Sequence, residues 1–407
     1  MRDEGADLPD QDPKNGDVNG IVIVGGGLAA VRTAEELRRE EYSGPITIVS
    51  DETRPPYDRP PLTKEVLRGE RDDTTLEPPE FYAGHNIALR LGCGARGVDT
   101  DAQTVTLADG TVLGYDQLVI ATGLVPRRIP SFGDLDGIRV VRSFEESLLL
   151  RGDAAAARRA VVIGAGFIGC EAAASLRKLG VDVALVEPQP APLAAVLGEQ
   201  IGELVARLHR ANGVDVRSGV GVAEVRGDGR VETVVLADGA ELEADLVVLG
   251  VGSTPATGWL DGCGVDVDNG VVCDATGRTS APNVWAVGDV AFWRGRDGHQ
   301  VRMEHWSNVV TQVRVMVPNM LGRESLHDVA VPAYFWSDQY DIKIQCLGEP
   351  EATDIVHMVE DDGHKFLAYY ERAGVLAGVV GAGRPGKVMA MRAKIAAGAP
   401  ISEVLAT

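Results

Sequence analysis

The chain has 407 residues and an acidic composition, with 39 Lys and Arg against 60 Asp and Glu and a formal net charge of −21. This length predicts two or three domains rather than a single core. The negative charge argues against nucleic acid or an anionic membrane surface as the main partner. No apolar run is long enough to cross a membrane and no basic, apolar leader opens the chain, so a cytoplasmic location is expected.

The first predicted elements are a leader and a nucleotide-binding unit. Residues 1–18 are acidic and rich in Gly and Pro, and they are expected to be disordered. The apolar strand IVIV then runs into Gly25, Gly27 and Ala30, a helix follows, and the strand ITIVS ends beside Asp51 and Glu52. Small residues at this spacing let the backbone approach a pyrophosphate at the N-terminus of the helix.

A polar segment stiffened by proline, RPPYDRPPLTKEVLRGE, follows this unit and cannot be an interior strand. It carries Arg59 and Lys64, close after the strand whose carboxyl end should border the nucleotide, although a plain surface loop is the alternative. The next stretch, QTVTLADGTVLGYDQLVIATG, predicts a hairpin that turns at DG and an apolar strand that returns to the first sheet.

The clearest unit is AVVIGAGFIGCEAAASLRKLGVDVALVEP, which predicts a strand, a glycine turn, an Ala-rich helix and a second strand in order. Gly164 suits the turn, Gly166 admits a pyrophosphate, and Gly169 lets the helix pack on the strand. Glu187 ends the second strand, where a carboxylate can bind ribose hydroxyls. A helix-packing glycine cluster is the alternative, but the repeated pattern predicts two nucleotides that meet, as in a flavoprotein reduced by a nicotinamide cofactor.

The rest of the chain predicts how these units are joined. Residues 127–250 are expected to form the second nucleotide-binding domain, whose last strand, ADLVVLGVGSTP, echoes DQLVIATGLVP. NVWAVGDVAFW predicts a buried strand that completes the first sheet and leaves Asp289 exposed, although GD can also be a simple turn. The first domain is therefore expected in two pieces, residues 19–126 and 251–325. Residues 326–407 predict a small α+β domain with an amphipathic helix at VMAMRAKIAAG.

The cysteines are scattered and form no CxxC or CxxxxC pair: Cys93, Cys170, Cys263, Cys273 and Cys346. An odd, unclustered set suits a reducing compartment and offers no redox disulfide and no metal or iron–sulfur cage, so no metal site is expected. A small buried apolar role is the plainer interpretation of each thiol.

Seven segments resemble the FAD-dependent NADH:ferredoxin reductases of cytochrome P450 and aromatic-ring oxygenase systems. They occur in the order GGGLAA, RPPYDRPPLTK, ATGLVPR, GAGFIGCE, VWAVGDVA, EHW and YFWSDQY. The resemblance runs from about residue 20 to the C-terminus and extends to apoptosis-inducing factor, rubredoxin reductase and, more distantly, glutathione reductase. It implies an α/β fold of two Rossmann-like dinucleotide-binding domains, similar to glutathione reductase, with a small α+β C-terminal domain.

The resemblance also implies the residues that contact FAD and NADH. Asp289 would hold the ribityl chain, and His305, Trp306 and Trp336 would flank the isoalloxazine. Ala95 would lie near the adenine, although its local sequence, GCGAR, departs from the commoner valine-containing version. The full implied set is Gly25, Gly26, Gly27, Leu28, Ala29, Ala30, Asp51, Glu52, Arg59, Lys64, Ala95, Ala121, Thr122, Gly123, Arg127, Gly164, Gly166, Phe167, Ile168, Gly169, Glu187, Gly252, Gly288, Asp289, Glu304, His305, Trp306 and Trp336.

Lys64 and Glu171 are the pair that the resemblance implies for catalysis. In the family these positions meet beside the flavin, where an ammonium can stabilise negative charge on the ring while the carboxylate keeps the lysine charged. An ordinary interdomain salt bridge is the alternative. Disulfide reductases of this fold carry cysteines near this position, whereas this chain carries RPPLTK there. Electrons are therefore expected to leave the flavin directly.

The predicted function is transfer of electrons from NADH through FAD to a ferredoxin that feeds a cytochrome P450 or a ring-hydroxylating oxygenase. Rubredoxin or a small oxidant as acceptor is one alternative. A redox-sensing interaction protein similar to apoptosis-inducing factor is the alternative from another class. Because ferredoxins in these systems are typically acidic, we also expect a locally basic docking face, or else scattered solvated charges, among Arg59, Arg302, Arg384, Lys387, Arg392 and Lys394.

Overall fold

The computed structural model describes residues 20–295, 298–323 and 332–406, so the leader expected at residues 1–18 lies outside the described residues. The chain divides into two compact units. Unit 1 comprises Met1–Asp58, Thr74–Val125 and Pro255–Asp328, and unit 2 comprises Arg59–Asp73, Pro126–Thr254 and Val329–Thr407. Two short strands contain points where the chain passes from one unit to the other: β8 (Leu124–Pro126) and β17 (Ser253–Pro255). The domain boundaries drawn from the sequence stay a prediction.

A five-stranded parallel sheet organises unit 1, with its strands in the order β20-β7-β1-β2-β3. All residues of the central strand and of its neighbour β2 are buried, as expected when both faces of a parallel sheet are covered. The pairing of β20 with β7 confirms that NVWAVGD completes the first sheet. The strands are β1 (Ile21–Val24), β2 (Ile46–Val49), β3 (Ile87–Arg90), β7 (Gln117–Ile120) and β20 (Val284–Ala286).

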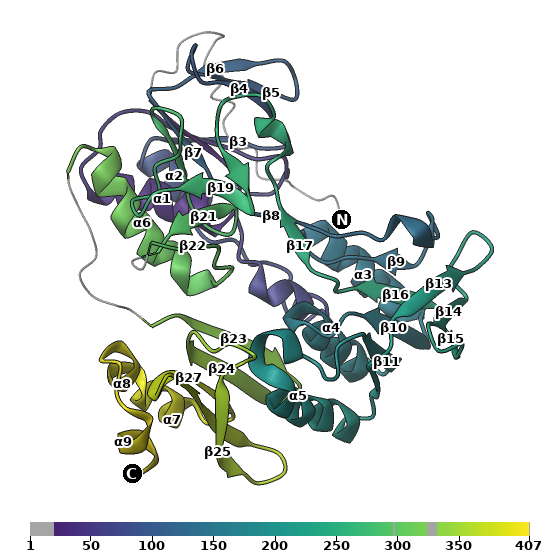
Figure 1. The fold of residues 1–407 in the computed structure, drawn as a ribbon. Coiled ribbons are helices and arrows are strands. Elements are labelled where there is room, and N and C mark those ends of the chain that lie inside the picture. Colours follow the sequence, from purple (N-terminus) through teal and green to yellow (C-terminus); the bar gives the residue numbers. More distant parts are fainter. Residues whose placement is uncertain (1–19, 296–297, 324–331, 407) are drawn as a thin grey trace. The chain divides into compact units, whose positions relative to one another are not determined.

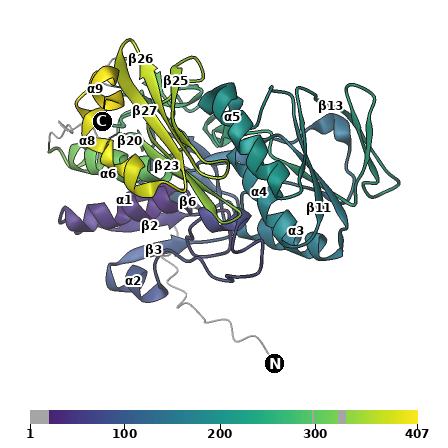
Figure 2. The same cartoon turned by 90° about the horizontal axis from the view of Figure 1, so that it is seen from below.

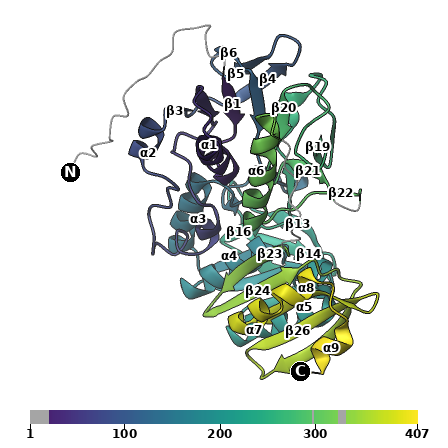
Figure 3. The ribbon, with the colours of Figure 1, turned by 90° about the vertical axis from the view of Figure 1, so that its left-hand side faces the viewer.

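Both faces of this sheet are covered by elements of unit 1. The helices α1 (Leu28–Arg39) and α6 (Trp306–Met320) pack together and share one hydrophobic core with alternate residues of the sheet (Figure 3). The other core is completed by small sheets and by η3 (Gly258–Leu260), and α2 (Pro79–Gly84) precedes β3. The small sheets contain β4 (Ala95–Asp99), β5 (Thr104–Leu107), β6 (Val112–Gly114), β18 (Val267–Asp268), β19 (Gly270–Cys273), β21 (Ala291–Arg294) and β22 (Gln300–Val301). Strands β5 and β6 form the hairpin predicted at DG.

A second five-stranded parallel sheet, in the order β12-β11-β10-β16-β9, organises the first part of unit 2 (Figure 1). The predicted strand, turn, helix and strand around Gly164 are confirmed as β10, α4 and β11. Its strands are β9 (Ile138–Arg139), β10 (Arg159–Ile163), β11 (Asp182–Glu187), β12 (Asp215–Ser218) and β16 (Leu246–Leu249), and its helices are α3 (Phe144–Ala156), α4 (Phe167–Lys178) and α5 (Ala194–Ala211). A three-stranded sheet follows β12: β13 (Val222–Arg226), β14 (Thr233–Leu236) and β15 (Glu241–Glu243).

The C-terminal part of unit 2 is an antiparallel sheet in the order β23-β24-β27-β26-β25, on which short helices pack (Figure 2). The single amphipathic helix expected at VMAMRAKIAAG is wrong, because two helices flank Met391 instead. None of the described helices is both long and apolar enough to cross a membrane. The strands are β23 (Tyr334–Gln339), β24 (Ile342–Gly348), β25 (Ile355–Asp361), β26 (Phe366–Arg372) and β27 (Val375–Ala382), and the helices are α7 (Pro385–Ala390), α8 (Arg392–Ala396) and α9 (Ile401–Leu405).

Both exposed and buried polar contacts join this antiparallel sheet to α5 within unit 2. Arg207 forms two hydrogen bonds to the Asp361 carboxylate, at 2.9 and 2.5 Å. The Tyr370 hydroxyl is fully buried and donates to the Leu197 carbonyl at 2.8 Å. His209 is also fully buried and its Nδ1 lies 2.8 Å from the hydroxyl oxygen of Tyr340 on the β23–β24 turn. The sheet therefore belongs to the same compact unit as α5.

We expect the burial of His209 to make the stability of the protein sensitive to acid. Burial lowers the pKa of its imidazole to about 4, although Gln339 opposes the shift. The folded protein holds the ring neutral, so the burial of His209 contributes to the free energy of unfolding only where the unfolded ring is also neutral. This contribution is complete above the ordinary pKa of about 6.5, and it is lost as the pH falls through that value towards 4. The full loss is about 3 kcal/mol. Urea unfolding between pH 4 and 7 measures it. The His209→Gln variant should show a smaller decline, and an identical decline would contradict the assignment.

Candidate functional site

The first glycine loop lies between β1 and α1, at the carboxyl end of the sheet in unit 1. A Cβ atom at Gly25 would lie 2.1 Å from the carbonyl oxygen of Ala121, and the residue has φ +135°, so only glycine fits this turn. Ala30 is fully buried where α1 packs on the sheet. The three small residues predicted from the sequence therefore bring the loop backbone close against the strand ends.

In the second glycine loop, in unit 2, one glycine is required for helix packing and another leaves space for a ligand. A Cβ atom at Gly169 would lie 1.9 Å from the Gly164 carbonyl oxygen, so this position must be glycine for α4 to approach β10. A Cβ atom at Gly166 would have no atom within 4 Å. The backbone at Gly166 thus faces open space at the start of α4, which is the arrangement that a pyrophosphate needs.

The N-termini of α1 and α4 fit bound phosphate because the protein itself leaves them uncapped. Gly27 and Gly166 are their N-cap residues, with no side-chain hydrogen bond and no acidic residue in the first turn. Helix α3 differs, because its N-terminus has a capping box in which Ser143 and Glu146 bind each other's backbone N–H groups. The free N–H groups and the helix dipole of α1 and α4 favour an anion there, so the residues fit one dinucleotide in each unit.

The acidic residues expected near ribose lie at the ends of the second strands. Glu187 accepts hydrogen bonds from the backbone N–H groups of Ala165, at 2.6 Å, and Gln189, at 2.9 Å. Its carboxylate therefore also holds the glycine loop, which the sequence did not reveal. Asp51 is exposed, and Glu52 accepts a hydrogen bond from the hydroxyl of Tyr57.

Lys64 and Glu171 form an ion pair within unit 2, with 2.8 Å between Nζ and Oε2. Each side chain is only 5 % exposed, so the pair is shielded from solvent. Thr63 donates its hydroxyl to the same carboxylate oxygen at 2.5 Å, and Ser337 donates to Oε1 at 2.8 Å. Lys64 also donates to the Pro60 carbonyl at 2.9 Å. Such partners are what a buried pair needs to remain charged.

The turn that carries Lys64 is held by helices of unit 2 rather than exposed as a loop. It forms the 3₁₀ helix η1 (Pro60–Thr63). Ser147 of α3 donates to the Leu62 carbonyl and Ser175 of α4 donates to the Thr63 carbonyl, both at 2.6 Å. The alternative of a plain surface loop is therefore wrong for these residues, because Leu62, Thr63 and Lys64 are buried.

The GD and EHW motifs lie together in unit 1. Asp289 is half-buried rather than exposed as expected, since β21 begins two residues later. His305 is the N-cap residue of α6, and burial lowers its pKa while the nearby Asp289 carboxylate opposes the shift. Trp306 is 37 % exposed and donates its indole N–H to Asp58 at 2.9 Å. Glu304 is exposed and forms an ion pair with Arg302.

Trp336 belongs to unit 2 and lies on β23, next to the serine that binds Glu171. Its ring stacks on Tyr334, with 5.9 Å between the ring centroids, and the Lys343 ammonium lies 5.6 Å from its centroid. Side chains alternate along a strand, so Trp336 and Ser337 face opposite sides of the sheet. Within unit 2, the structure brings Lys64, Glu171 and Ser337 together.

The remaining sequence-predicted residues lie in loops, in strands and at the starts of helices. Thr122 donates to the Ala256 carbonyl at 2.8 Å in unit 1. In unit 2, Arg127 is exposed and its backbone N–H donates to the Gly252 carbonyl at 3.0 Å, while Arg59 donates to a backbone carbonyl. The others lie in loops, in the first turns of α1 and α4 or, for Ala95, on β4: Gly26, Leu28, Ala29, Ala95, Ala121, Gly123, Phe167, Ile168 and Gly288.

Two members of the expected basic docking face, Arg384 and Lys387, form ion pairs with acidic residues. Arg384 donates to Glu360 and Asp362, in each case at 2.8 Å, and Lys387 forms an ion pair with Glu360. The hydrogen bonds from Lys387 and Arg384 lower the pKa of Glu360, so these charges offset one another locally. Arg392 remains exposed on α8. The charges of Arg384 and Lys387 are therefore offset by neighbouring acids, and the docking face as a whole stays a prediction.

The five cysteines are free thiols. Burial raises the pKa of Cys170, which precedes Glu171 on α4, and a raised pKa makes its thiol a poor nucleophile. Within the described ranges, no group of three or more His, Cys, Asp and Glu side chains could hold a metal ion.

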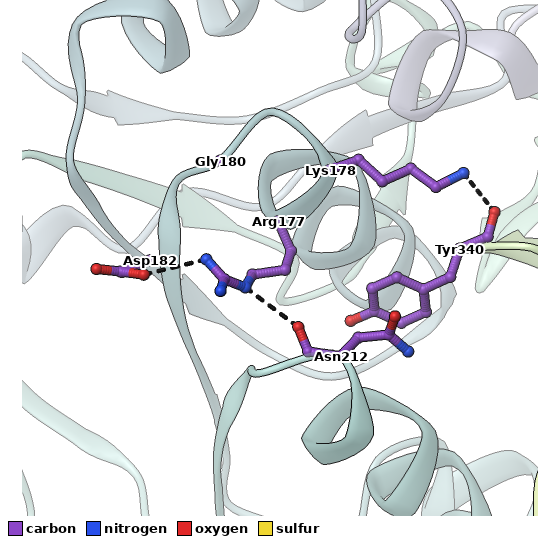
Figure 4. A pocket seen from close by; sticks show the side chains of 6 residues that line it. All are labelled: Arg177, Lys178, Gly180, Asp182, Asn212 and Tyr340. Atoms are coloured by element: carbon purple, nitrogen blue, oxygen red, sulfur yellow. Dashed lines mark hydrogen bonds and ion pairs between the residues drawn. The ribbon is translucent and has the colours of Figure 1, made fainter.

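An open pocket of about 560 Å³ lies in unit 2, around the carboxyl end of α4 (Figure 4). Its two basic side chains already have partners: Arg177 binds Asp182 at 3.0 Å and the Asn212 carbonyl at 3.1 Å, and Lys178 donates to the Tyr340 carbonyl. The Lys178 contact joins α4 to the β23–β24 turn, whereas the Arg177 contacts join α4 to the start of β11 and to the residue after α5. They do not converge on a common point in the pocket.

Sequence reasoning missed the hydroxyl groups that complete the ion pair. Thr63 and Ser337 are separated from Glu171 by long stretches of chain, and neither has a motif of its own. The usable signal would have been that each lies beside a residue already singled out, Lys64 or Trp336.

Comparison with known families covers nearly the whole chain. Residues 19–312 match the family described as pyridine nucleotide-disulphide oxidoreductase, and residues 334–407 match the family described as reductase C-terminal. The chain is 37% identical over 390 residues to rhodocoxin reductase of Rhodococcus erythropolis, covering 94% of this chain and 90% of that protein. It is 37% identical over 344 residues to putidaredoxin reductase of Pseudomonas putida, covering 82% and 81%.

A solved structure shares this fold throughout. The reductase in a covalent putidaredoxin reductase–putidaredoxin complex matches with a TM-score of 0.89 and 32% identity, over 95% of this chain and 94% of that one. The predicted fold class is thereby confirmed.

Proposed function

Because the chain belongs to the pyridine nucleotide-disulphide oxidoreductase family, we propose that it is an FAD-dependent NADH:ferredoxin reductase. Its acceptor is an iron–sulfur ferredoxin, which in turn serves a cytochrome P450 or a ring-hydroxylating oxygenase. The observation that carries this proposal is the similarity along almost the whole chain to a reductase solved in complex with putidaredoxin. The two uncapped glycine loops supply the two nucleotide sites that such an enzyme needs.

The residues have separate roles in this proposal. The loop before α1 would hold the FAD diphosphate, and the loop before α4 would hold that of NADH. When bound, FAD supplies the conversion of two-electron into one-electron transfer. Lys64 would hold a positive charge beside the flavin ring, and Glu171 would keep that ammonium charged and in place. Asp289, His305, Trp306 and Trp336 are the proposed contacts to the ribityl chain and the ring.

The decisive experiment is reduction of cytochrome c by the FAD-loaded protein and NADH, with and without candidate ferredoxins. We expect turnover to depend on ferredoxin. Equal rates without ferredoxin would support direct reduction of another acceptor, of which rubredoxin is the nearest candidate. Slow turnover with every acceptor, together with a long-lived reduced complex that changes its association state, would favour a redox-sensing protein instead.

The enzyme is expected to use NADH in preference to NADPH, with kcat/KM at least about tenfold higher. The reason is that Glu187 places a carboxylate at the ribose position and the following EPQPAPLAAVLGEQ contains no Arg or Lys to bind a 2′-phosphate. Steady-state kinetics with the two cofactors measure the ratio, and equal values would contradict the assignment.

Glu187→Gln is the informative variant for this preference. It removes the charge but keeps a side-chain oxygen that can accept the hydrogen bond from Ala165, whereas alanine would also release the loop. The ratio should fall in Glu187→Gln without loss of NADH binding. Glu203→Gln, an exposed change on α5, is the control.

A further inference from the structure

A buried serine completes the hydrogen bonding of the carboxylate that binds Lys64. Ser337 is fully buried on β23 and donates its hydroxyl to Glu171 Oε1 at 2.8 Å. The other oxygen, Oε2, receives Lys64 at 2.8 Å and Thr63 at 2.5 Å. Both oxygens of the carboxylate thus have donors, and these donors come from the η1 segment and from β23 in the C-terminal sheet.

A hydrogen bond from Gln339 orients the Ser337 hydroxyl group. Gln339, two residues along β23 on the same buried face, donates its side-chain N–H to the Ser337 oxygen at 3.2 Å. Because that bond uses the oxygen as an acceptor, the hydroxyl hydrogen remains free to point at Glu171. Lys64, Thr63 and Ser337 thus converge on one carboxylate, and each contact restricts the orientation of that carboxylate.

We propose that Ser337 is a positioning residue for the Lys64–Glu171 pair. This inference rests on the proposed function, in which Lys64 acts beside the flavin ring. By holding Oε1, Ser337 prevents the carboxylate from turning about its terminal bond and keeps Oε2 directed at Lys64. The C-terminal sheet therefore supports the reducing chemistry through a single hydrogen bond as well as through its own aromatic side chains.

The first test uses protein without FAD. Unfolding by denaturant is measured for Ser337→Ala, Glu171→Gln and the double variant, and the two changes should be non-additive because they act on one hydrogen bond. Tyr370→Phe is the matched control, since it also removes a fully buried hydroxyl bond between the C-terminal sheet and the rest of unit 2 without touching Glu171. Its effect should add to that of Glu171→Gln. Additive effects of Ser337→Ala would overturn the proposal.

The second test uses FAD-loaded protein and stopped-flow reduction by NADH. Ser337→Ala should slow flavin reduction about tenfold, within the range that a hydrogen bond to a charged group supplies. Its affinity for NADH should be unchanged, and the midpoint potential of the flavin should fall. Tyr370→Phe should change the rate less than about twofold if it acts on stability alone. Equal slowing in the two variants would reduce Ser337 to a structural role.

Two further results separate a failure of this proposal from a failure of the proposed function. If Ser337→Ala does not fold, Gln339→Leu removes the N–H that orients the hydroxyl, and flavin reduction should slow about threefold while the serine remains; an unchanged rate overturns the proposal. If the wild-type protein binds no FAD or does not reduce ferredoxin, the proposed function fails. The unfolding cycle without FAD still decides whether Ser337 and Glu171 are coupled.

Discussion

Glu171→Ala is expected to lower the free energy of unfolding by about 3–5 kcal/mol, the cost of removing one partner from a buried ion pair. The Lys64 side chain is 5 % exposed, so the ammonium would be left without its counter-charge and without water. In FAD-loaded protein, reduction by NADH should also slow by about tenfold or more. Denaturant unfolding and stopped-flow reduction measure the two effects.

The matched control for this change is Glu203→Ala, which breaks an exposed ion pair with Arg210 in the same unit. It should cost less than about 1 kcal/mol. Lys64→Met combined with Glu171→Leu removes both charges and should recover stability without recovering fast flavin reduction. If the free energy of unfolding of Glu171→Ala lies within about 1 kcal/mol of the wild-type value, the ion pair is not buried as described above.

Lys64→Ala should fold and bind FAD but reduce the flavin slowly, because it removes the proposed charge beside the ring. This variant leaves the Glu171 carboxylate with two hydroxyl donors, from Thr63 and Ser337. Reduction at the wild-type rate with an unchanged flavin potential would remove Lys64 from the mechanism.

Gly169→Ala is expected to abolish NADH binding, whereas Gly166→Ala should fold normally. The Cβ atom at Gly169 would lie 1.9 Å from the Gly164 carbonyl oxygen, so α4 must move away from β10, at a cost of about 1–3 kcal/mol. The Cβ atom at Gly166 meets no protein atom within 4 Å, so any loss there must come from the ligand.

Thermal unfolding and NADH titration distinguish the two glycine variants. Gly169→Ala should lower the unfolding temperature of protein without cofactors, and Gly166→Ala should weaken NADH binding alone. FAD should still bind to both, because the other glycine loop is unchanged. Equal stability of the two variants would contradict the assigned division between packing and ligand access.

The two glycine loops could be predicted from the sequence because their signals are local. Strand, turn and helix follow one another within a few residues, and sterics restrict Gly25 and Gly169 to glycine. The Lys64–Glu171 contact came from the resemblance alone, since no local pattern encodes a pair so far apart in the chain. For the same reason the sequence did not show that Arg384 is paired, because the acids that bind it come from another strand, β25, and the turn that follows it.

The strand order of unit 1 has a consequence for the nascent chain. Its sheet is incomplete until β20 (Val284–Ala286) leaves the ribosome, and one of its hydrophobic cores also requires residues of α6, which is synthesised later. All five strands of the parallel sheet in unit 2 lie between Ile138 and Leu249, so that sheet has its full set of strands earlier in synthesis. The middle part of the chain is therefore expected to fold first, and the N-terminal sheet is completed only when β20, far along the chain, pairs with β7.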